Sequence, residues 1–235
     1  MTDISAVKDI LRTVSRHRSK GDAAAKQGNS ERAEQAWAAA LAKSEEGFDV
    51  LAITPELSPL RARSLSNEVA VHAAELMGVR GGLLHRLGRP RDALASYRTG
   101  AMLETSHHLP QTYNRVNAIK RGLIVGVSDL IDLHDEIATA RATLDKRLST
   151  DETAADDAWL WADLGDLCLL LGEDDSAISA YRGFVARGRS DSPASTLAVL
   201  KEIVAALQEH GDPDAGRVAA SLRHVEEMLS GSRAL

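Results

Sequence analysis

The sequence predicts an all-α protein, and three observations support this prediction. Apolar residues recur at helical spacing, as in the series Ala33, Ala36, Trp37, Ala40 and Leu41. No segment alternates apolar and polar residues with period two, and alanine, leucine, glutamate and arginine are abundant where β-formers are sparse. The six prolines stand at the edges of the periodic segments, where a missing N–H group suits a helix start.

The first 105 residues are expected to form four helices. Gly28 and Gly88 end the first and the third, because glycine readily adopts the left-handed conformation that closes a helix. Asn29 or Ser30 caps the second, because a short polar side chain accepts a hydrogen bond from a free N–H group of the first turn. These helices are expected at residues 3–27, 30–52, 59–87 and 90–105.

The rest of the chain is expected to form six helices whose short connections fold them back as antiparallel hairpins. The expected capping residues are Ser128, Thr150 or Asp151, Ser192 and Asp212, and the expected stops are Gly172 and Gly211. The helices are expected at residues 110–124, 128–147, 152–171, 174–187, 193–210 and 213–229.

A helix–turn–helix pattern recurs in one register around Gly28, Gly88 and Gly172. Each copy has a glycine before the turn, then an alanine, an aromatic residue and a further packing residue after it. We expect the small residues to let the two helices approach closely and the aromatic residue to fill the gap between hairpins. The copies contain Gly21, Ala33, Trp37 and Ala40; Gly81, Ala93, Tyr97 and Gly100; and Gly165, Ala177, Tyr181 and Phe184.

This pattern resembles the tetratricopeptide repeat (TPR), whose Trp-x-x-Leu-Gly motif is intact in the segment WLWADLG that ends at Gly165. The resemblance implies a TPR-like helical-hairpin solenoid. Irregular inserted helices are expected as well, because the turn glycines are not about 34 residues or a multiple of that apart. We therefore expect a single TPR-like domain over residues 1–235, with repeat units at about 14–43, 74–105 and 158–188 and a degenerate unit at 193–229.

Residues 74–207 are also similar to the TRAFs-binding TPR-like domain. That domain occurs in some mitogen-activated protein kinase kinase kinases and in bacterial signalling and defence proteins. The likeness rests on the order of a repeat ending ALASYRTG, the segment TYNRVNAIKRG and the repeat WLWADLGDLCLLLGEDDSAISAYR. Tyr113, Asn114, Asn117 and Ala118 match its Tyr-x-x-Asn-Ala core. The resemblance implies an adaptor or regulatory module without catalysis of its own.

Composition argues against several classes of protein. A net charge of −6, without a strong basic run, argues against binding of nucleic acid or anionic lipid. Neither a signal peptide nor about 18 uninterrupted apolar residues is found, so we expect a soluble cytoplasmic protein that is not in a membrane. The single cysteine, Cys168, leaves no disulfide framework.

The sequence shows no catalytic constellation, so we expect neither an enzyme nor a cofactor or metal site. No nucleophile elbow, phosphate-binding loop or dinucleotide fingerprint occurs. His107 and His108 are adjacent but lack an obvious third ligand, which favours a solvated loop over a metal site. Cys168 lies between two leucines, which favours a buried thiol with a raised pKa over a nucleophile.

A partner is expected on the first helices of the hairpins, because these line the concave surface of a helical-repeat protein. Trp159 is either an exposed anchor or packed under the 128–147 helix. Asn114 and Asn117 either clamp a ligand main chain or staple the 105–111 loop. The predicted partner-binding residues are Arg18, Asp22, Lys26, Glu75, Gly82, His85, Arg86, Asn114, Asn117, Trp159, Ala162 and Asp166.

Two functions are compatible with these features. The first is an adaptor that holds a partner protein or peptide in its groove and self-associates. The alternative is a sensor whose helices at 106–157 close over a peptide or small molecule and shift the superhelix. An adaptor should copurify with a protein, whereas a sensor should gain a small ligand that raises its melting temperature.

Overall fold

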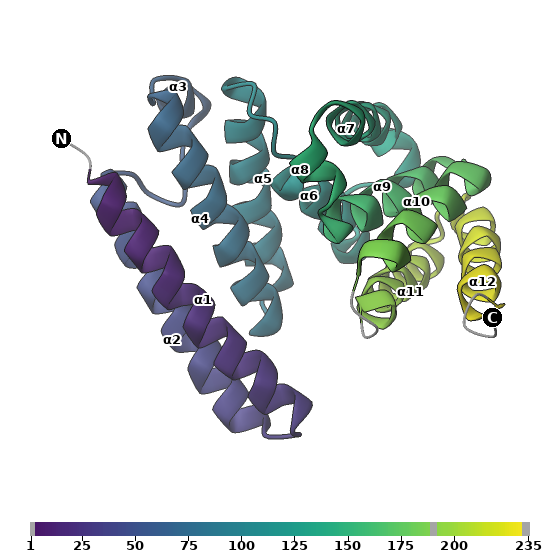
Figure 1. Cartoon of the computed structure of the whole chain (residues 1–235), viewed down its shortest axis with the longest axis horizontal. Coiled ribbons are helices and arrows are strands. Elements are labelled where there is room, and N and C mark those ends of the chain that lie inside the picture. The colour runs from purple at the N-terminus through teal and green to yellow at the C-terminus, as the bar shows by residue number, and fades with distance from the viewer. Residues whose placement is uncertain (1–2, 189–191, 232–235) are drawn as a thin grey trace. The chain divides into compact units, whose positions relative to one another are not determined.

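The computed structural model describes residues 3–188 and 192–231, which form helices joined by turns and loops without a β-strand (Figure 1). The prediction of an all-α protein is therefore confirmed. The chain forms two compact units, residues 1–118 and residues 119–235, which we call unit 1 and unit 2 and describe separately.

Unit 1 is built from two antiparallel hairpins, α1–α2 and α4–α5, and α2 also packs against α4. The short helix α3 lies against α5. The division between the units falls inside α6. The helices of unit 1 are α1 (Ile4–Lys26), α2 (Ser30–Leu51), α3 (Pro59–Arg63), α4 (Asn67–Arg86), α5 (Pro90–Ser106) and the first part of α6 (Tyr113–Val125).

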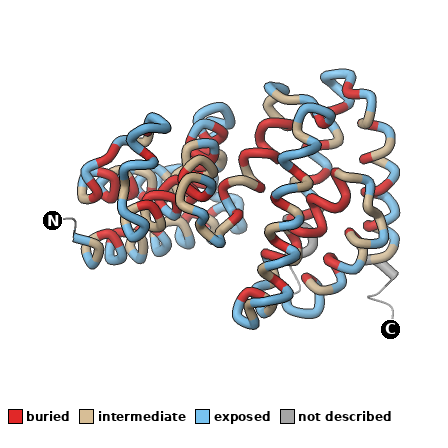
Figure 2. Tube along the Cα trace, turned by 90° about the horizontal axis from the view of Figure 1, so that it is seen from above, coloured by how far each residue is buried: buried red, intermediate tan, exposed pale blue. Residues whose placement is uncertain are grey.

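Unit 2 contains one further long hairpin, α9–α10, with α7 packed against α9 and α12 against both α10 and α11. Figure 2 shows that, across the described helices, buried positions alternate with exposed ones, as amphipathic helices require. Besides the rest of α6, unit 2 contains α7 (Leu130–Thr150), α8 (Glu152–Ala155), α9 (Ala158–Leu171), α10 (Asp174–Arg187), α11 (Ser192–His210) and α12 (Ala215–Gly231).

Most predicted helix boundaries are confirmed by their local chemistry. The four stop glycines all have positive φ, from 69° at Gly88 to 79° at Gly172. Asn29 caps α2 by accepting a hydrogen bond from the N–H of Arg32 at 3.1 Å, and Asp151 caps α8. Ser192 was expected to cap the helix at 193–210, but its side chain lies outside the part of the chain that the structure describes.

Two predicted helices were wrong because polar side chains break each of them in two. The helix expected at 59–87 stops before Ser64, and a new helix starts where Ser66 accepts a hydrogen bond from the N–H of Val69. The helix expected at 152–171 is interrupted where Asp157 accepts one from the N–H of Trp159 at 2.9 Å. Capping by these short side chains competes with an unbroken helical ladder.

Three other helices start later than predicted, and in one of them a distant carboxylate accepts the first N–H group. The helix expected at 128–147 begins at Leu130, whose N–H donates to Asp212 at 2.9 Å, and Ser128 is not its cap. The helix expected at 110–124 begins at Tyr113, and the one expected at 213–229 begins at Ala215.

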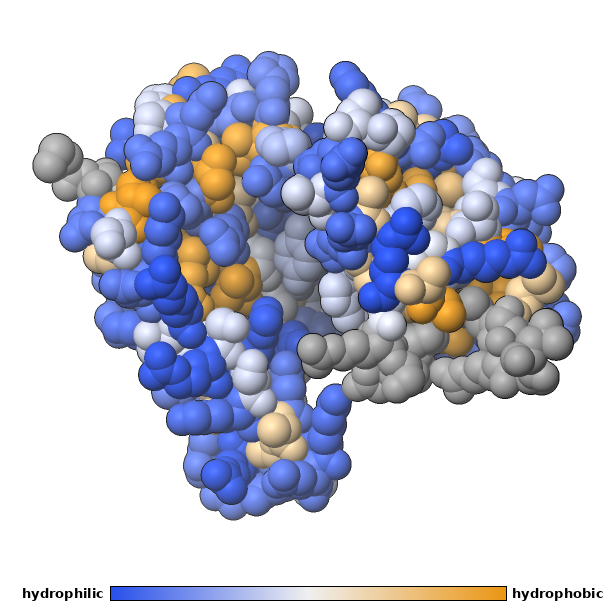
Figure 3. Space-filling model, viewed as in Figure 1, coloured by the Kyte–Doolittle hydropathy of each residue, from blue (hydrophilic) through white to orange (hydrophobic). Residues whose placement is uncertain are grey.

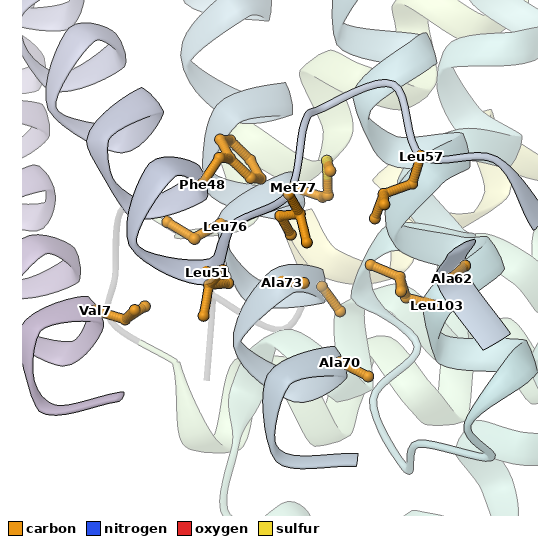
Figure 4. Close-up of a cluster of buried hydrophobic side chains, with 12 residues drawn as sticks. Val7, Phe48, Leu51, Leu57, Ala62, Ala70, Ala73, Leu76, Met77 and Leu103 are labelled. Carbon is orange, nitrogen blue, oxygen red and sulfur yellow. The ribbon is translucent and has the colours of Figure 1, made fainter. Parts of the chain in front are cut away.

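The core of unit 1 lies where α2, α4 and α5 meet. Phe48, Leu76, Met77 and Leu103 are almost completely buried there (Figure 4). Alanines such as Ala73 lie among them, so that large and small side chains interlock between the helices.

Each long hairpin is closed by an aromatic ring that lies against a glycine of the opposite helix. The pairs are Gly21 with Trp37, Gly81 with Tyr97, and Gly165 with Tyr181. A Cβ on Gly81 would lie 2.8 Å from the Tyr97 ring, and one on Gly165 would lie 2.8 Å from the Tyr181 ring. The rings therefore pack within their own hairpins, whereas the sequence led us to expect them between hairpins.

We predict that Gly165→Ala destabilises the protein by about 1–3 kcal/mol, because the new methyl group overlaps the buried Tyr181 ring. Gly216→Ala is the control, since no atom lies within 4 Å of a Cβ there and alanine suits a helix better. Urea denaturation of both variants measures the difference. Equal stabilities would contradict tight packing of the ring on Gly165.

Candidate functional site

A pocket of about 470 Å³ opens in unit 1 between α1, α4, α5 and the start of α6. Three of the predicted partner-binding residues, Arg18, Glu75 and Asn114, come together in its lining. In Figure 3, hydrophobic side chains show between hydrophilic ones over the helices α1 and α4 of unit 1. The other lining residues are Val71, Ala74, Val79, Glu104, Gln111 and Tyr113.

Tyr113 is the exposed aromatic residue of this pocket, with 47% of its surface accessible. Its ring meets the buried Tyr97 ring edge to face, with 6.0 Å between centroids. Gly78 makes this possible, because a Cβ there would lie 2.9 Å from the Tyr113 ring. The sequence pointed to Tyr113 only as part of the segment TYNRVNAIKRG and not as a residue of this pocket.

Glu104 and Asn114 form a buried network behind the pocket. Glu104 accepts hydrogen bonds from the backbone N–H groups of Asn114 and Arg115 and from the Asn114 side chain, at 2.9–3.1 Å. Asn114 also donates to the carbonyl of Ala74 at 2.9 Å. Burial raises the pKa of the Glu104 carboxyl, although the hydrogen bonds from Asn114 and Arg115 oppose this. The network ties α4, α5 and α6 together.

Neither asparagine side chain donates to the 105–111 loop, although the stapling alternative expected this. Asn114 is buried and its amide joins α4 to α5, while Gly100 leaves the space that this amide fills. Asn117 donates to the carbonyl of Tyr113, within its own helix. Both amide N–H groups therefore serve the fold.

Beyond the pocket, the same face of α4 continues through Gly82 to Arg86. Arg86 pairs with Asp22 of α1, with 2.9 Å between Nε and Oδ1, and Asp22 also accepts a hydrogen bond from the indole N–H of Trp37 at 3.0 Å. The structure thus brings three more predicted residues next to one another. Of the remaining two in unit 1, Lys26 is exposed in the last turn of α1 and His85 is half-buried in α4.

Two predicted site residues in unit 2 are buried and do not form an open surface. Ala162 is 2% exposed and Asp166 is 1% exposed. Lys120 of α6 pairs with Asp163 at 2.9 Å and also with Asp166. The Tyr181 hydroxyl donates to Asp166 at 2.5 Å. Burial lowers the pKa of Lys120, but the two carboxylates outweigh this and raise it above its usual value.

Trp159 is 54% exposed, as the anchor alternative requires. Its ring lies on that of Phe184, with 5.6 Å between centroids. It is therefore not packed under the helix at 128–147. This exposed ring lies in unit 2 and does not line the pocket of unit 1.

The other candidate residues have structural partners. His107 is not simply solvated, because its ring nitrogens lie 2.9 Å from Asn67 Oδ1 and 2.8 Å from the Ala62 carbonyl. The described residues contain no group of three His, Cys, Asp or Glu side chains able to hold a metal ion. In the same part of the chain, no helix is long and apolar enough to cross a membrane.

A comparison of the chain with protein-family models finds no match, and a comparison with curated proteins finds none either. The likeness to TPR proteins therefore rests on the residues quoted above.

We predict that Lys120→Ala destabilises the protein by about 3–5 kcal/mol, because it leaves the buried Asp166 carboxylate without its cation. Lys201→Ala is the matched control, because it removes an exposed ion pair with Glu226 and should cost less than about 1 kcal/mol. Chemical denaturation followed by circular dichroism compares the two. Similar losses would contradict a buried charge network.

We also predict that Cys168 resists alkylation in the native protein. Burial raises the pKa of its thiol to about 11 from a usual value of 9.0, although Arg141 opposes this. At pH 8 the thiolate, which is the reactive form, is then about 100-fold scarcer than in the unfolded chain. Mass spectrometry after iodoacetamide treatment, with and without denaturant, measures this. Equal rates in both would show an open thiol.

Proposed function

We propose that the chain is a non-catalytic interaction module whose unit 1 groove binds an extended segment of a partner protein. The observation that carries this proposal is the 470 Å³ pocket, in which a half-exposed tyrosine, an arginine and an apolar floor lie together. Concave sites of this composition bind ligands by apolar contact, with a few polar groups that fix orientation.

The lining suits a peptide. Val71, Ala74 and Val79 offer apolar contact to one side chain of the ligand. Arg18 can donate to a main-chain carbonyl, and the Gln111 side-chain oxygen, which is buried and has no hydrogen-bond partner among the described residues, can accept from a main-chain N–H. A peptide main chain supplies both kinds of group.

We favour a binding role over catalysis because the buried carboxylate and amide N–H groups of the pocket already form hydrogen bonds within the protein. Glu104, the one carboxylate deep in the lining, already accepts three hydrogen bonds that hold the start of α6. The Asn114 amide N–H groups are likewise used between helices. These groups position Tyr113 and the pocket walls.

The assignment of a protein family and of a cellular role is part of the same proposal. The three hairpins with a ring against a glycine support membership of the TPR superfamily, and the segment around Tyr113 supports the narrower likeness to the TRAFs-binding domain. The module would then act as an adaptor or scaffold in cytoplasmic signalling or defence. Its partner is a protein or peptide, with self-association as a further property.

Selection of phage-displayed peptides on the full chain tests this proposal. We predict that Tyr113→Ala weakens the selected peptides at least about tenfold, because an exposed aromatic anchor carries much of the energy of such contacts. Trp159→Ala removes the exposed aromatic of unit 2 and should leave the affinity unchanged. Fluorescence anisotropy gives the affinities, and circular dichroism checks that each variant is folded.

Loss of binding with Trp159→Ala but not with Tyr113→Ala would contradict a site in unit 1. Failure to select any peptide would contradict peptide binding altogether.

A further inference from the structure

We infer that the pocket of unit 1 selects a basic side chain, lysine or arginine, in the extended segment that it binds. This inference rests on the proposed function and names the chemistry that the pocket recognises. It comes from the charges of the pocket lining and from the lining atoms that have no hydrogen-bond partner.

The lining carries more negative than positive charge. Its acidic residues are Glu75 of α4 and Glu104 of α5, and its basic residue is Arg18 of α1. A cation in the pocket is therefore attracted by two carboxylates and repelled by one guanidinium group. An anion experiences the opposite balance, so the charges of the lining complement a basic ligand.

Glu104 is a buried carboxylate without a counter-ion. It is almost completely buried and forms no ion pair with the described residues. Its three hydrogen bonds from Asn114 and Arg115 favour the charged form, but burial outweighs them and raises the pKa of the carboxyl. Since buried charges in proteins are normally paired, a cation in the pocket would supply the compensation that the chain itself does not.

Two oxygen atoms of the lining are buried and have no hydrogen-bond donor among the described residues. They are the side-chain oxygens of Gln111 and Asn114. The orientation of the Asn114 amide is fixed, because its nitrogen donates to the carbonyl of Ala74 and to Glu104, and a flip would place its oxygen against two acceptors. Both oxygens accept hydrogen bonds only. Their partial negative charges add to the charge of Glu104 beneath the pocket surface.

Two exposed groups of the lining can contact a cation directly. Tyr113 has about half of its surface accessible, and an aromatic ring attracts an ammonium or guanidinium group through its π-electrons. The Glu75 side chain is 54% exposed. Its carboxylate lies 3.6 Å from His72 Nδ1, which is too far for a hydrogen bond. A basic group can therefore lie on the Tyr113 ring and pair with Glu75.

The apolar part of the lining suits the stem of such a side chain. Val71, Ala74 and Val79 lie in the same lining as the two carboxylates. Lysine and arginine bury their methylene groups on apolar surface while their charged ends stay near water or a carboxylate. The pocket thus combines apolar walls, an exposed ring and negative charge, which is the combination that a long basic side chain requires.

Titration of the full chain with three short peptides, followed by amide NMR shifts, tests the inference. The peptides are N-acetylated tripeptide amides with arginine, lysine or citrulline between two leucines. Citrulline has nearly the shape of arginine without its charge, and the acetyl group removes the terminal ammonium. We expect both basic peptides to shift Tyr113 and Asn114 with a Kd about tenfold below that of the citrulline peptide.

The variant Glu75→Gln removes a charge of the lining and keeps the shape of the side chain. It should reduce the preference for arginine over citrulline to about threefold, because an exposed ion pair contributes modestly. Glu34→Gln is the matched control, since it removes an exposed carboxylate of α2 that is not part of the lining, and it should leave the preference unchanged. Circular dichroism checks that both variants are folded.

Three outcomes would overturn the inference. The arginine and citrulline peptides bind equally well, or none of the three peptides shifts Tyr113, or Glu75→Gln leaves the tenfold preference intact. Each can occur while peptides selected by phage display still lose affinity with Tyr113→Ala. In that case the proposed function stands, and only the preference for a basic side chain is wrong.

Discussion

An aromatic ring held against a glycine is the contact on which each long hairpin depends. With no Cβ at Gly21, Gly81 or Gly165, the helix that bears the ring can approach the glycine-bearing helix closely. The ring then fills the space between them, which gives dense packing without a strained side chain. Because the ring direction is set, its polar tip reaches the residue that follows the glycine, and the chemistry of that residue distinguishes one hairpin from another.

The middle hairpin uses this arrangement differently from the other two. Its ring, Tyr97, meets a second ring, Tyr113, edge to face. Tyr113 is placed by the start of α6, and that start is fixed because Glu104 of α5 accepts the N–H groups of Asn114 and Arg115. Gly78 and Gly100 leave room for the Tyr113 and Asn114 side chains. The pocket is thus a consequence of how α6 is held on α4 and α5.

Rules that use only neighbouring residues predicted the helix ends that a turn glycine or a capping side chain determines. The four turn glycines end their helices as expected, and Asn29 caps its helix as expected. The breaks before Ser66 and Asp157 were missed because helical apolar periodicity continues across them, while a single capping side chain decides the outcome.

Contacts between residues that are far apart in the sequence could not be predicted from neighbouring residues alone. Nothing near Asp166 in the sequence shows that Lys120 covers it, so the repeat pattern placed Asp166 on an open surface. In unit 1 the same rules identified Arg18, Glu75 and Asn114, which do line one pocket, but not Tyr113 as its exposed ring. The contact of Lys120 in α6 with Asp166 in α9, which no local rule predicts, thus accounts for the failed prediction of an open Asp166.

A double-mutant cycle on Tyr181 and Asp166 measures most directly whether the ring and the following carboxylate act as a pair. The stabilities of Tyr181→Phe, Asp166→Asn and the double variant give the coupling energy between the two side chains. A hydrogen bond of 2.5 Å between buried groups predicts a coupling of about 1–3 kcal/mol. Additive losses, with no coupling, would contradict the view that the polar tip of the ring is held by the residue after the glycine.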